Sequence, residues 1–234
     1  MYECNQFTRT ELALGKDGIE KLKNSKIVLF GLGGVGSYIA EALARVGIGN
    51  LIIIDGDTVD ITNINRQLIA NINTIGKNKA ELVKERISLI NPLANVVAIS
   101  KFVKSEDDID FIDETVDYVI DAIDDFDAKI MIIKKAKEIG LNLISSMGTA
   151  KRLHGDMFKI ADISKTKVCP LAKKMRRELR KLRINKVKVL YSDEIPAEMH
   201  EIDGYVGKSL GSVSFVPPVA GMLIAGEVVR DLLK

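Results

Sequence analysis

The fold follows from one segment, Lys26-Ile-Val-Leu-Phe-Gly-Leu-Gly-Gly-Val-Gly-Ser37, in which an apolar run leads into a glycine-rich turn. The apolar run predicts a buried strand, and the residues after the glycines predict a helix. Such a turn directs free backbone N–H groups and the positive end of the helix toward one point, which favours a bound phosphate. The segment therefore predicts a nucleotide site built on four glycines, Gly31, Gly33, Gly34 and Gly36.

Apolar runs alternate with amphipathic stretches on the carboxyl-terminal side of this segment. We expect strands at Lys26–Phe30, Leu51–Ile54, Val96–Ser100, Val116–Asp121 and Leu141–Ser145. We expect helices at Gly34–Val46, Lys77–Ile90, Glu106–Glu114 and Phe126–Ile139. Right-handed crossovers then give an α/β fold, a doubly wound, Rossmann-like, mostly parallel sheet with helices on both faces and ligands at the carboxyl ends of its strands.

After Ser145 the alternation of apolar runs and amphipathic stretches is less regular. A carboxyl-terminal extension is predicted to add strands at Asp156–Ile160 and Val187–Tyr191 and a basic helix at Leu171–Arg183. The mixture of Gly, Asp, Glu, Ser and Pro from Tyr191 to Ser212 predicts an exposed loop. Pro217-Pro218 opens a last helix that runs to Leu233, and its apolar part is too short and interrupted for a membrane span, so we expect a core or dimer-interface helix.

The composition is that of an ordinary soluble globular protein. The chain has 234 residues, of which 47% are apolar and 28% charged, enough for one substantial core. Only Cys4 and Cys169 are present, which argues against a disulfide scaffold and a structural zinc site. The first residues lack the order of a signal peptide. We therefore expect a cytoplasmic protein without membrane attachment.

The net charge of +2 is unevenly distributed. Residues 173–188 hold nine Lys or Arg and one Glu, a local charge of +8 that leaves −6 for the remaining chain. Such a block is able to recognise a polyanion through its phosphates. The alternative interpretation is a solvated helix face.

Polar residues after the second strand narrow the type of nucleotide. Asp55 lies about twenty residues beyond the last glycine, where an acid holds ribose hydroxyls. The glycines alone do not distinguish a nicotinamide cofactor from ATP. Arg66 and Lys79 favour ATP, because adenylyl transfer places negative charge on the α-phosphoryl group and on the leaving pyrophosphate. Asn63 adds a neutral donor, and Asp124 follows the fourth strand, where a magnesium-binding carboxylate is expected.

At these residues the chain resembles the adenylating family of ubiquitin-activating and sulfur-carrier-activating enzymes. The matching motifs are Gly31-Leu-Gly-Gly-Val-Gly-Ser37, Asp55-Gly-Asp57, Thr62-Asn-Ile-Asn-Arg-Gln67, Gly76-Lys-Asn-Lys79, Ile90-Asn-Pro92 and Asp121-Ala-Ile-Asp-Asp125. The resemblance implies that Asp55 and Asp57 face the nucleotide sugar and its surroundings. It implies that the triphosphate is gripped by Asn63, Arg66, Gln67 and Lys79, and that Asp124 holds Mg²⁺. It also implies a homodimer in which Arg9 reaches the ATP of the partner.

Motifs outside the nucleotide core resemble those of the tRNA threonylcarbamoyladenosine dehydratases. These motifs are Ser145-Ser-Met-Gly-Thr-Ala150, Ile160-Ala-Asp-Ile-Ser-Lys-Thr166, Pro170-Leu-Ala-Lys-Lys174, Tyr191-Ser-Asp-Glu-Ile-Pro196 and Ser214-Phe-Val-Pro-Pro-Val-Ala-Gly221. The resemblance implies an ATP-dependent ring closure of threonylcarbamoyladenosine beside the tRNA anticodon, through an acyl-adenylate of the threonine carboxylate. It implies tRNA contacts from the basic block, namely Lys173, Lys174, Arg176, Arg177, Arg180, Lys181 and Arg183.

Other functions share parts of this pattern. A sulfur-carrier adenylyltransferase would use the same nucleotide core, but the chain lacks the two Cys-x-x-Cys zinc pairs usual in such relatives. A nicotinamide-dependent dehydrogenase leaves Arg66 and Lys79 unexplained, and a non-catalytic tRNA-binding protein would release no AMP. Some relatives bind a monovalent cation, whose ligands the sequence does not place, and docking of a sulfur-relay protein stays open.

We expect a single domain over residues 1–234. Residues 1–150 are predicted to form the nucleotide-binding core, and residues 151–234 an extension that binds tRNA and contributes to the dimer interface.

Overall fold

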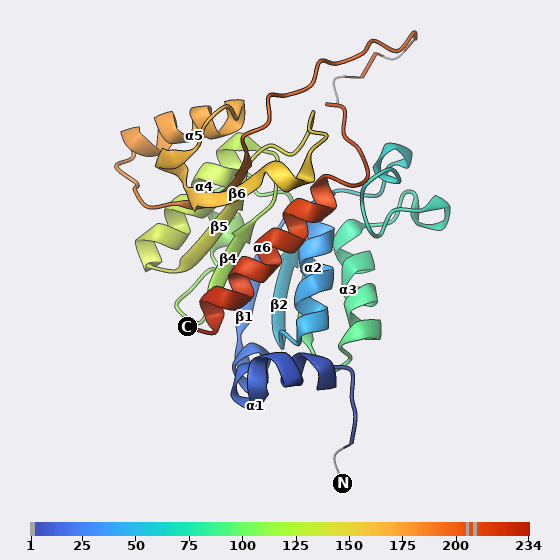
Figure 1. Ribbon diagram of the computed structural model, residues 1–234, viewed down its shortest axis with the longest axis vertical. Helices are drawn as coiled ribbons and strands as arrows, with labels where there is room; N and C mark the ends of the chain where they lie inside the picture. The colour runs from blue at the N-terminus through green and yellow to red at the C-terminus, as the bar shows by residue number, and fades with distance from the viewer. Residues whose placement is uncertain (1–2, 205, 208–209) are drawn as a thin grey trace.

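The computed structural model describes residues 3–204, 206–207 and 210–234. Seven strands of this part of the chain form one sheet in the order β3-β2-β1-β4-β5-β7-β6 (Figure 1). Their bounds are β1 Lys26–Phe30, β2 Asn50–Ile54, β3 Asn95–Ile99, β4 Tyr118–Asp121, β5 Asn142–Ser146, β6 Phe158–Asp162 and β7 Lys188–Ser192. β6 pairs antiparallel with β7, and the other neighbours pair in parallel, which confirms the predicted mostly parallel sheet.

Helices cover both faces of the sheet and one of its ends (Figure 1). They are α1 Thr8–Asn24, α2 Gly36–Val46, α3 Lys79–Ile90, α4 Phe126–Ile139, α5 Pro170–Lys181 and α6 Pro217–Leu232. Alternate residues of β1 point to opposite faces, so Ile27 and Leu29 pack under α2, α3 and α6, while Val28 and Phe30 pack under α4 and α5. The predicted doubly wound arrangement is confirmed.

The register brings the ends of three strands level. Phe30, at the end of β1, stands opposite Ile54 of β2 on one side and Asp121 of β4 on the other. The residues that follow these strands therefore leave the sheet at one edge. Most of the predicted site residues lie at this edge.

The prediction of a helix at Glu106–Glu114 is wrong. A short 3-10 helix covers only Glu106–Ile109. Asp108 accepts hydrogen bonds from the backbone of Lys104 and Ser105, and Asp113 accepts from the backbone of Thr115. These short acidic side chains bond to the local backbone and stabilise turns instead of a helix.

The helix α1 was not predicted. It consists of two helical pieces, because Gly15 adopts a positive φ of 77° between them. Leu22, near its end, is fully buried. Figure 1 shows α1 below the sheet, at the end opposite to the carboxyl ends of β1 and β2.

The last helix packs on α2. A Cβ at Gly221 would lie 2.6 Å from the carbonyl oxygen of Val35, so glycine is required for this close approach. Val219, Met222 and Leu223 on α6 are partly exposed. The predicted core role is confirmed, and the dimer-interface role stays a prediction.

The loop predicted from Tyr191 to Ser212 begins after β7 has ended at Ser192. Tyr205, Lys208 and Ser209 of this segment lie outside the described residues. Its described part after Ile195 has neither helix nor strand and is mostly exposed. Within the described residues, none of the helices combines the length and the apolar content needed to cross a membrane.

An ion network ties α6 to the sheet at the end away from the glycine turn. Lys188 of β7 donates to Glu227 at 2.7 Å and also to Asp231, and the hydroxyl of Tyr118 donates to Asp231 at 2.8 Å. Burial by itself would raise the pKa of Asp231, but hydrogen bonds from Lys188, Lys234 and Tyr118 outweigh it and lower the pKa to about 2. The charged carboxylate therefore stabilises the fold.

We expect Asp231→Asn to lower the free energy of unfolding by about 1 to 2 kcal/mol at pH 7. The folded-state pKa lies below the unfolded value, so the stabilisation is complete above about pH 5 and is lost as the pH falls toward 2. The difference in melting temperature between variant and wild type should thus shrink over this range in thermal unfolding followed by circular dichroism. Asp107→Asn, at an exposed carboxylate, is the control. A gap that stays constant down to pH 2 would contradict the prediction.

Candidate functional site

The glycine turn joins β1 to α2 at the carboxyl edge of the sheet. Gly31 has a φ of 84°, and a Cβ there would lie 2.7 Å from the carbonyl oxygen of Ala122, so the turn requires glycine. A Cβ at Gly36 would lie 1.7 Å from the Gly31 carbonyl oxygen, which also excludes any side chain. No side chain of the described residues caps the start of α2. Within α2, the N–H groups of Ser37 and Tyr38 already donate to the carbonyl oxygens of Gly33 and Val35, so the N–H groups suited to an anion are those of the glycine turn before them.

Asp55 fastens this turn to the end of β2. Its carboxylate accepts from the N–H of Leu32 at 2.7 Å and from the N–H of Asp57 at 2.8 Å. Burial raises the pKa of the Asp55 carboxyl, against the hydrogen bond from Asp57 and the charge of Lys79. Both carboxylate oxygens thus bind the local backbone, and a contact with the ribose of a nucleotide stays a prediction.

Lys79 and Asp57 form an ion pair beside the turn. Nζ of Lys79 lies 2.9 Å from Oδ2 of Asp57, and only 5% of the Lys79 side chain is exposed, against 53% for Asp57. A nearly buried cation interacts more strongly with an added anion than a solvated one does. Lys79 is thus a buried cation held at the start of α3, and its action on a phosphate stays a prediction.

The segment from Thr62 to Gln67 lies over the glycines. Arg66 donates to the carbonyl oxygen of Thr62 at 3.0 Å and to Oδ1 of Asn65 at 2.8 Å. A Cβ at Gly34 would lie 3.1 Å from Cγ of Arg66, so the stem of Arg66 rests against the turn. The Arg66 stem therefore lies at the turn, while its guanidinium is bound by Thr62 and Asn65 of the same segment, and its contact with a phosphate stays a prediction.

The segment also contributes two buried side-chain amides, those of Asn63 and Gln67. Asn63 is buried, and its Oδ1 accepts from the N–H of Asp60 at 3.1 Å. The Nε2 of Gln67 lies 3.7 Å from the position of a Cβ at Gly33. The buried Oε1 of Gln67 has no hydrogen-bond partner among the residues that the structure describes. An unpaired buried acceptor beside the turn is suited to a donor from a ligand.

Asp124 extends from the loop after β4. Ala122, two residues earlier, contacts the Gly31 position, so this loop borders the turn. Asp124 is exposed, whereas its neighbour Asp125 caps α4 by accepting from the N–H of Ala128 at 2.8 Å. Mg²⁺ in nucleotide sites binds one or two carboxylates together with phosphate oxygens, and Asp124 fits that donor set.

A buried cluster that the sequence did not predict lies next to this loop. Asp121 and Lys129 form a fully buried ion pair, and the hydroxyl of Ser145 also donates to Asp121. The signal was the position of Lys129 on the stripe of α4 that also carries Ile132, Ile133 and Ala136. A lysine among apolar residues at this spacing indicates a buried, paired cation.

The basic helix α5 lies next to the Asp124 loop. Nζ of Lys174 lies 3.6 Å from the centre of the Phe126 ring, and Phe126 is two residues after Asp124. α5 buries Ala172, Met175 and Leu179. The exposed members of the predicted tRNA-binding set are Lys173, Lys174, Arg177, Arg180, Lys181 and Arg183.

One member of that set has a structural role. Arg176 is only partly exposed and donates to the carbonyl oxygen of Thr166 at 2.9 Å and to its hydroxyl. It therefore holds the segment before α5, and its place among the predicted tRNA contacts is the least favoured by the geometry.

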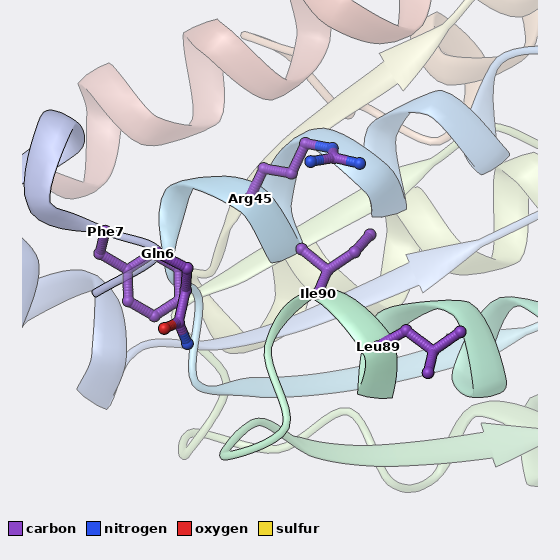
Figure 2. Close-up of a pocket in the computed structure, with 5 residues that line it drawn as sticks. All are labelled: Gln6, Phe7, Arg45, Leu89 and Ile90. Atoms are coloured by element: carbon purple, nitrogen blue, oxygen red, sulfur yellow. The ribbon is translucent and has the colours of Figure 1, made fainter. Parts of the chain in front are cut away.

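Arg9 does not join the site of its own chain. It is exposed on the first turn of α1, and Phe7 beside it contacts Gly47, just after the end of α2. The glycine turn precedes α2, whose eleven residues span about 16 Å. Figure 2 shows a pocket near the start of α1, lined by Gln6, Phe7, Arg45, Leu89 and Ile90. This pocket is thus remote from the glycine turn.

A model of the ThiF family matches residues 7–234 of the chain. The chain belongs to the ThiF family. This family assignment covers the nucleotide edge, the basic helix and α6 together.

Similar ThiF-family proteins include a curated relative and two solved structures. The tRNA threonylcarbamoyladenosine dehydratase of Bacillus subtilis is 46% identical over 242 residues, which cover 98% of this chain and 95% of that protein. The crystal structure of the E. coli tRNA N6-threonylcarbamoyladenosine dehydratase TcdA in complex with AMP superposes with a TM-score of 0.89 at 30% identity, covering 97% and 94% of the two chains. The complex of the same E. coli enzyme with ATP gives a TM-score of 0.88 at 29% identity, with 97% and 93% covered.

The remaining polar candidates in this ThiF-family chain are isolated. Cys169 is buried before α5, and Cys4 is exposed. Among the described residues, no three His, Cys, Asp or Glu side chains gather into a group able to hold a metal ion. A metal at Asp124 would therefore depend on ligands from the nucleotide.

Proposed function

We propose that the chain catalyses the ATP-dependent cyclisation of threonylcarbamoyladenosine next to the anticodon of a tRNA, with loss of one water. The main support is that Lys174 of the basic helix α5 contacts Phe126, the first residue of α4, directly after the Asp124 loop and at the edge that also holds the glycine turn. A tRNA bound on α5 would bring its modified base to the nucleotide. The names of the B. subtilis and E. coli relatives support the same function.

The first step activates the threonine carboxylate of the substrate. A carboxylate oxygen forms a bond to the α-phosphorus of ATP while the bond to the leaving pyrophosphate breaks, giving an acyl-adenylate. Arg66 and Lys79 offset the negative charge that develops, and the side-chain N–H groups of Gln67 and Asn63 donate to the phosphates and orient them. When bound, Mg²⁺ at Asp124 would add further neutralisation of that charge.

The second step needs little from the protein. A nitrogen or oxygen of the carbamoyl group of the substrate attacks the activated carbonyl carbon and displaces AMP, which closes the ring. Both reacting groups belong to one molecule, so the attack gains the entropy advantage of proximity, worth several kcal/mol. The contribution of the protein is to hold the base and keep water from the adenylate.

The two parts of the chain would have different roles in this reaction. Residues 1–150 would bind ATP and Mg²⁺, and residues 151–234 would bind tRNA and contribute to a homodimer interface. The monovalent cation and the sulfur-relay partner stay predictions without further support. A cytoplasmic location fits a tRNA substrate and two unpaired cysteines.

The test is mass spectrometry of nucleosides from tRNA that carries threonylcarbamoyladenosine, after incubation with the protein, ATP and Mg²⁺. We expect the modified nucleoside to lose the mass of one water, and AMP to form in equal amount. Heat-denatured protein and omission of ATP are the controls. An unchanged nucleoside with active ATP-binding protein would contradict the proposal.

The alternative function is adenylation of the carboxyl terminus of a ubiquitin-like sulfur-carrier protein, for which the same nucleotide edge would serve. Pyrophosphate release distinguishes the two functions. Dependence on modified tRNA supports the proposal, and dependence on a small protein ending in Gly-Gly supports the alternative.

Arg9 provides a test of the homodimer. We expect Arg9→Ala and Lys79→Ala each to be inactive alone, and an equal mixture to recover about a quarter of wild-type turnover, because randomly formed heterodimers contain one complete site. AMP release after mixing and subunit exchange measures this recovery. Arg45→Ala mixed with Lys79→Ala is the control for exchange alone. No recovery in verified heterodimers would exclude a trans role for Arg9.

A further inference from the structure

The buried cluster below the Asp124 loop uses every polar group it contains. Nζ of Lys129 donates to both carboxylate oxygens of Asp121, at 3.0 and 2.9 Å, and to the carbonyl oxygen of Ser146 at 2.8 Å. The ammonium group has three protons, and each has an acceptor. Asp121 also accepts from the hydroxyl of Ser145 at 2.5 Å and from the N–H of Ile123 at 3.2 Å. Asp121 and Lys129 have no exposed side-chain surface.

These bonds hold both ends of one loop. Asp121 ends β4, and Lys129 lies in the first turns of α4, so the pair spans the residues that include Asp124. Ile123 is held to Asp121, and Asp125 is held to Ala128. Asp124 is thus the exposed carboxylate between two fastened neighbours. Ser145 and Ser146 extend the cluster to the end of β5.

Stability alone does not account for such a pair. Burying two charges carries a desolvation cost that often exceeds their attraction, and apolar residues of similar size frequently stabilise a fold as well. A cluster that fixes three neighbouring segments does restrict where the loop lies. In metal and nucleotide sites, residues behind a ligand set its orientation and affinity.

We propose that the Asp121–Lys129 pair, with Ser145, is a positioning device that holds the Asp124 carboxylate in place at the nucleotide edge. Its function in positioning a metal-nucleotide complex rests on the proposed function, whereas its effect on the loop does not. Neither residue touches substrate, and both act through Asp124.

The first experiment measures the loop directly. The double variant Asp121→Asn/Lys129→Met removes both charges together, because removing one alone would leave an unpaired buried charge. Hydrogen exchange of the purified protein should show amides of residues 122–128 exchanging about tenfold faster or more. Lys188→Met is the matched control, because it removes a lysine from the ion network at the opposite end of the sheet. It should lower the melting temperature without changing exchange in this loop.

The second experiment measures metal binding without tRNA. Mn²⁺, followed by electron paramagnetic resonance in the presence of a non-hydrolysable ATP analogue, should bind about 10- to 100-fold more weakly to the double variant, the range typical of residues behind a ligand. Affinity for the analogue without metal should change little. Ser145→Ala, which removes one donor to Asp121, should give a smaller shift in the same direction. If the double variant does not fold, the Mn²⁺ affinity of Ser145→Ala tests the proposal in its place.

The outcomes separate this proposal from the proposed function. Unchanged loop exchange and unchanged Mn²⁺ affinity, with a lowered melting temperature, would overturn the positioning role and leave a purely structural pair. Faster loop exchange together with weaker Mn²⁺ binding supports it. If wild-type protein does not modify tRNA, the proposed function fails, and the exchange experiment still decides whether the pair holds the loop.

Discussion

Lys79→Met is expected to lower the rate of AMP formation by about 10²- to 10³-fold, equivalent to about 2.7 to 4 kcal/mol of transition-state stabilisation. Lys79 is nearly buried at the start of α3 and pairs with Asp57, and its contact with a phosphate is the prediction that this variant tests. Negative charge increases on the phosphates during adenylyl transfer, so the loss should appear more in kcat than in the KM for ATP. Single-turnover AMP release with modified tRNA measures it.

The fold should tolerate this change. The partner Asp57 is half exposed, and an ion pair with such exposure stabilises a protein by about 0 to 1 kcal/mol. Methionine keeps most of the buried stem of the lysine. Lys77→Met is the matched control, since Lys77 is exposed two residues earlier and carries the same charge. Equal rates for Lys79→Met and wild type would remove Lys79 from the site.

The parts of the fold that sequence could predict are those in which one local pattern is sufficient. β1 is a continuous apolar run that is buried on both faces, and the turn after it has positions where only glycine fits, so the sequence predicts both the strand and the edge of the sheet that follows it. α4 has an acidic cap at Asp125 and a glycine after its end, and its predicted bounds match the structure.

Other elements depend on contacts that the local pattern does not contain. Residues 106–114 have helical spacing, but acidic side chains that bond to nearby N–H groups end the helix after one turn. α1 carries Gly15 and Gly18, which weaken any local prediction of a helix, and its stability comes from packing under the sheet through residues such as Leu22.

The residues of the candidate site also fall into those that a local sequence pattern predicts and those that depend on tertiary contacts. Residues next to the glycine turn could be predicted, because parallel strands deliver their following residues to one edge. The segment Asp121-Ala-Ile-Asp-Asp125 contains three carboxylates, and sequence does not tell that Asp121 is buried with Lys129 while Asp124 is exposed. The position of Arg9 relative to a partner subunit likewise depends on a second chain, so the sequence of one chain does not predict it.

Neutralising one face of the basic helix α5 is expected to weaken tRNA binding strongly. Lys173, Arg177 and Arg180 are exposed and follow the spacing i, i+4, i+7, so they lie on one side of α5. The triple change to glutamine should weaken tRNA binding about tenfold or more at low salt. Each lost phosphate contact should reduce the slope of log affinity against log salt by about 0.7 to 0.9, or about 2 to 3 in total. Filter binding over a salt series measures both quantities.

The matched control changes three exposed lysines of α1, Lys16, Lys21 and Lys23, to glutamine. It removes the same net charge at the other end of the molecule, so it tests whether the general field or the helix face matters. We expect a small loss of affinity and an unchanged salt slope for this control, and ATP affinity close to wild type in both variants. Because α5 contacts the start of α4, next to the Asp124 loop, through Lys174 and Phe126, the helix variant should also slow AMP formation at limiting tRNA but not at saturating tRNA. Equal salt slopes in the helix variant and wild type would place the tRNA elsewhere and remove the main support for the proposed function.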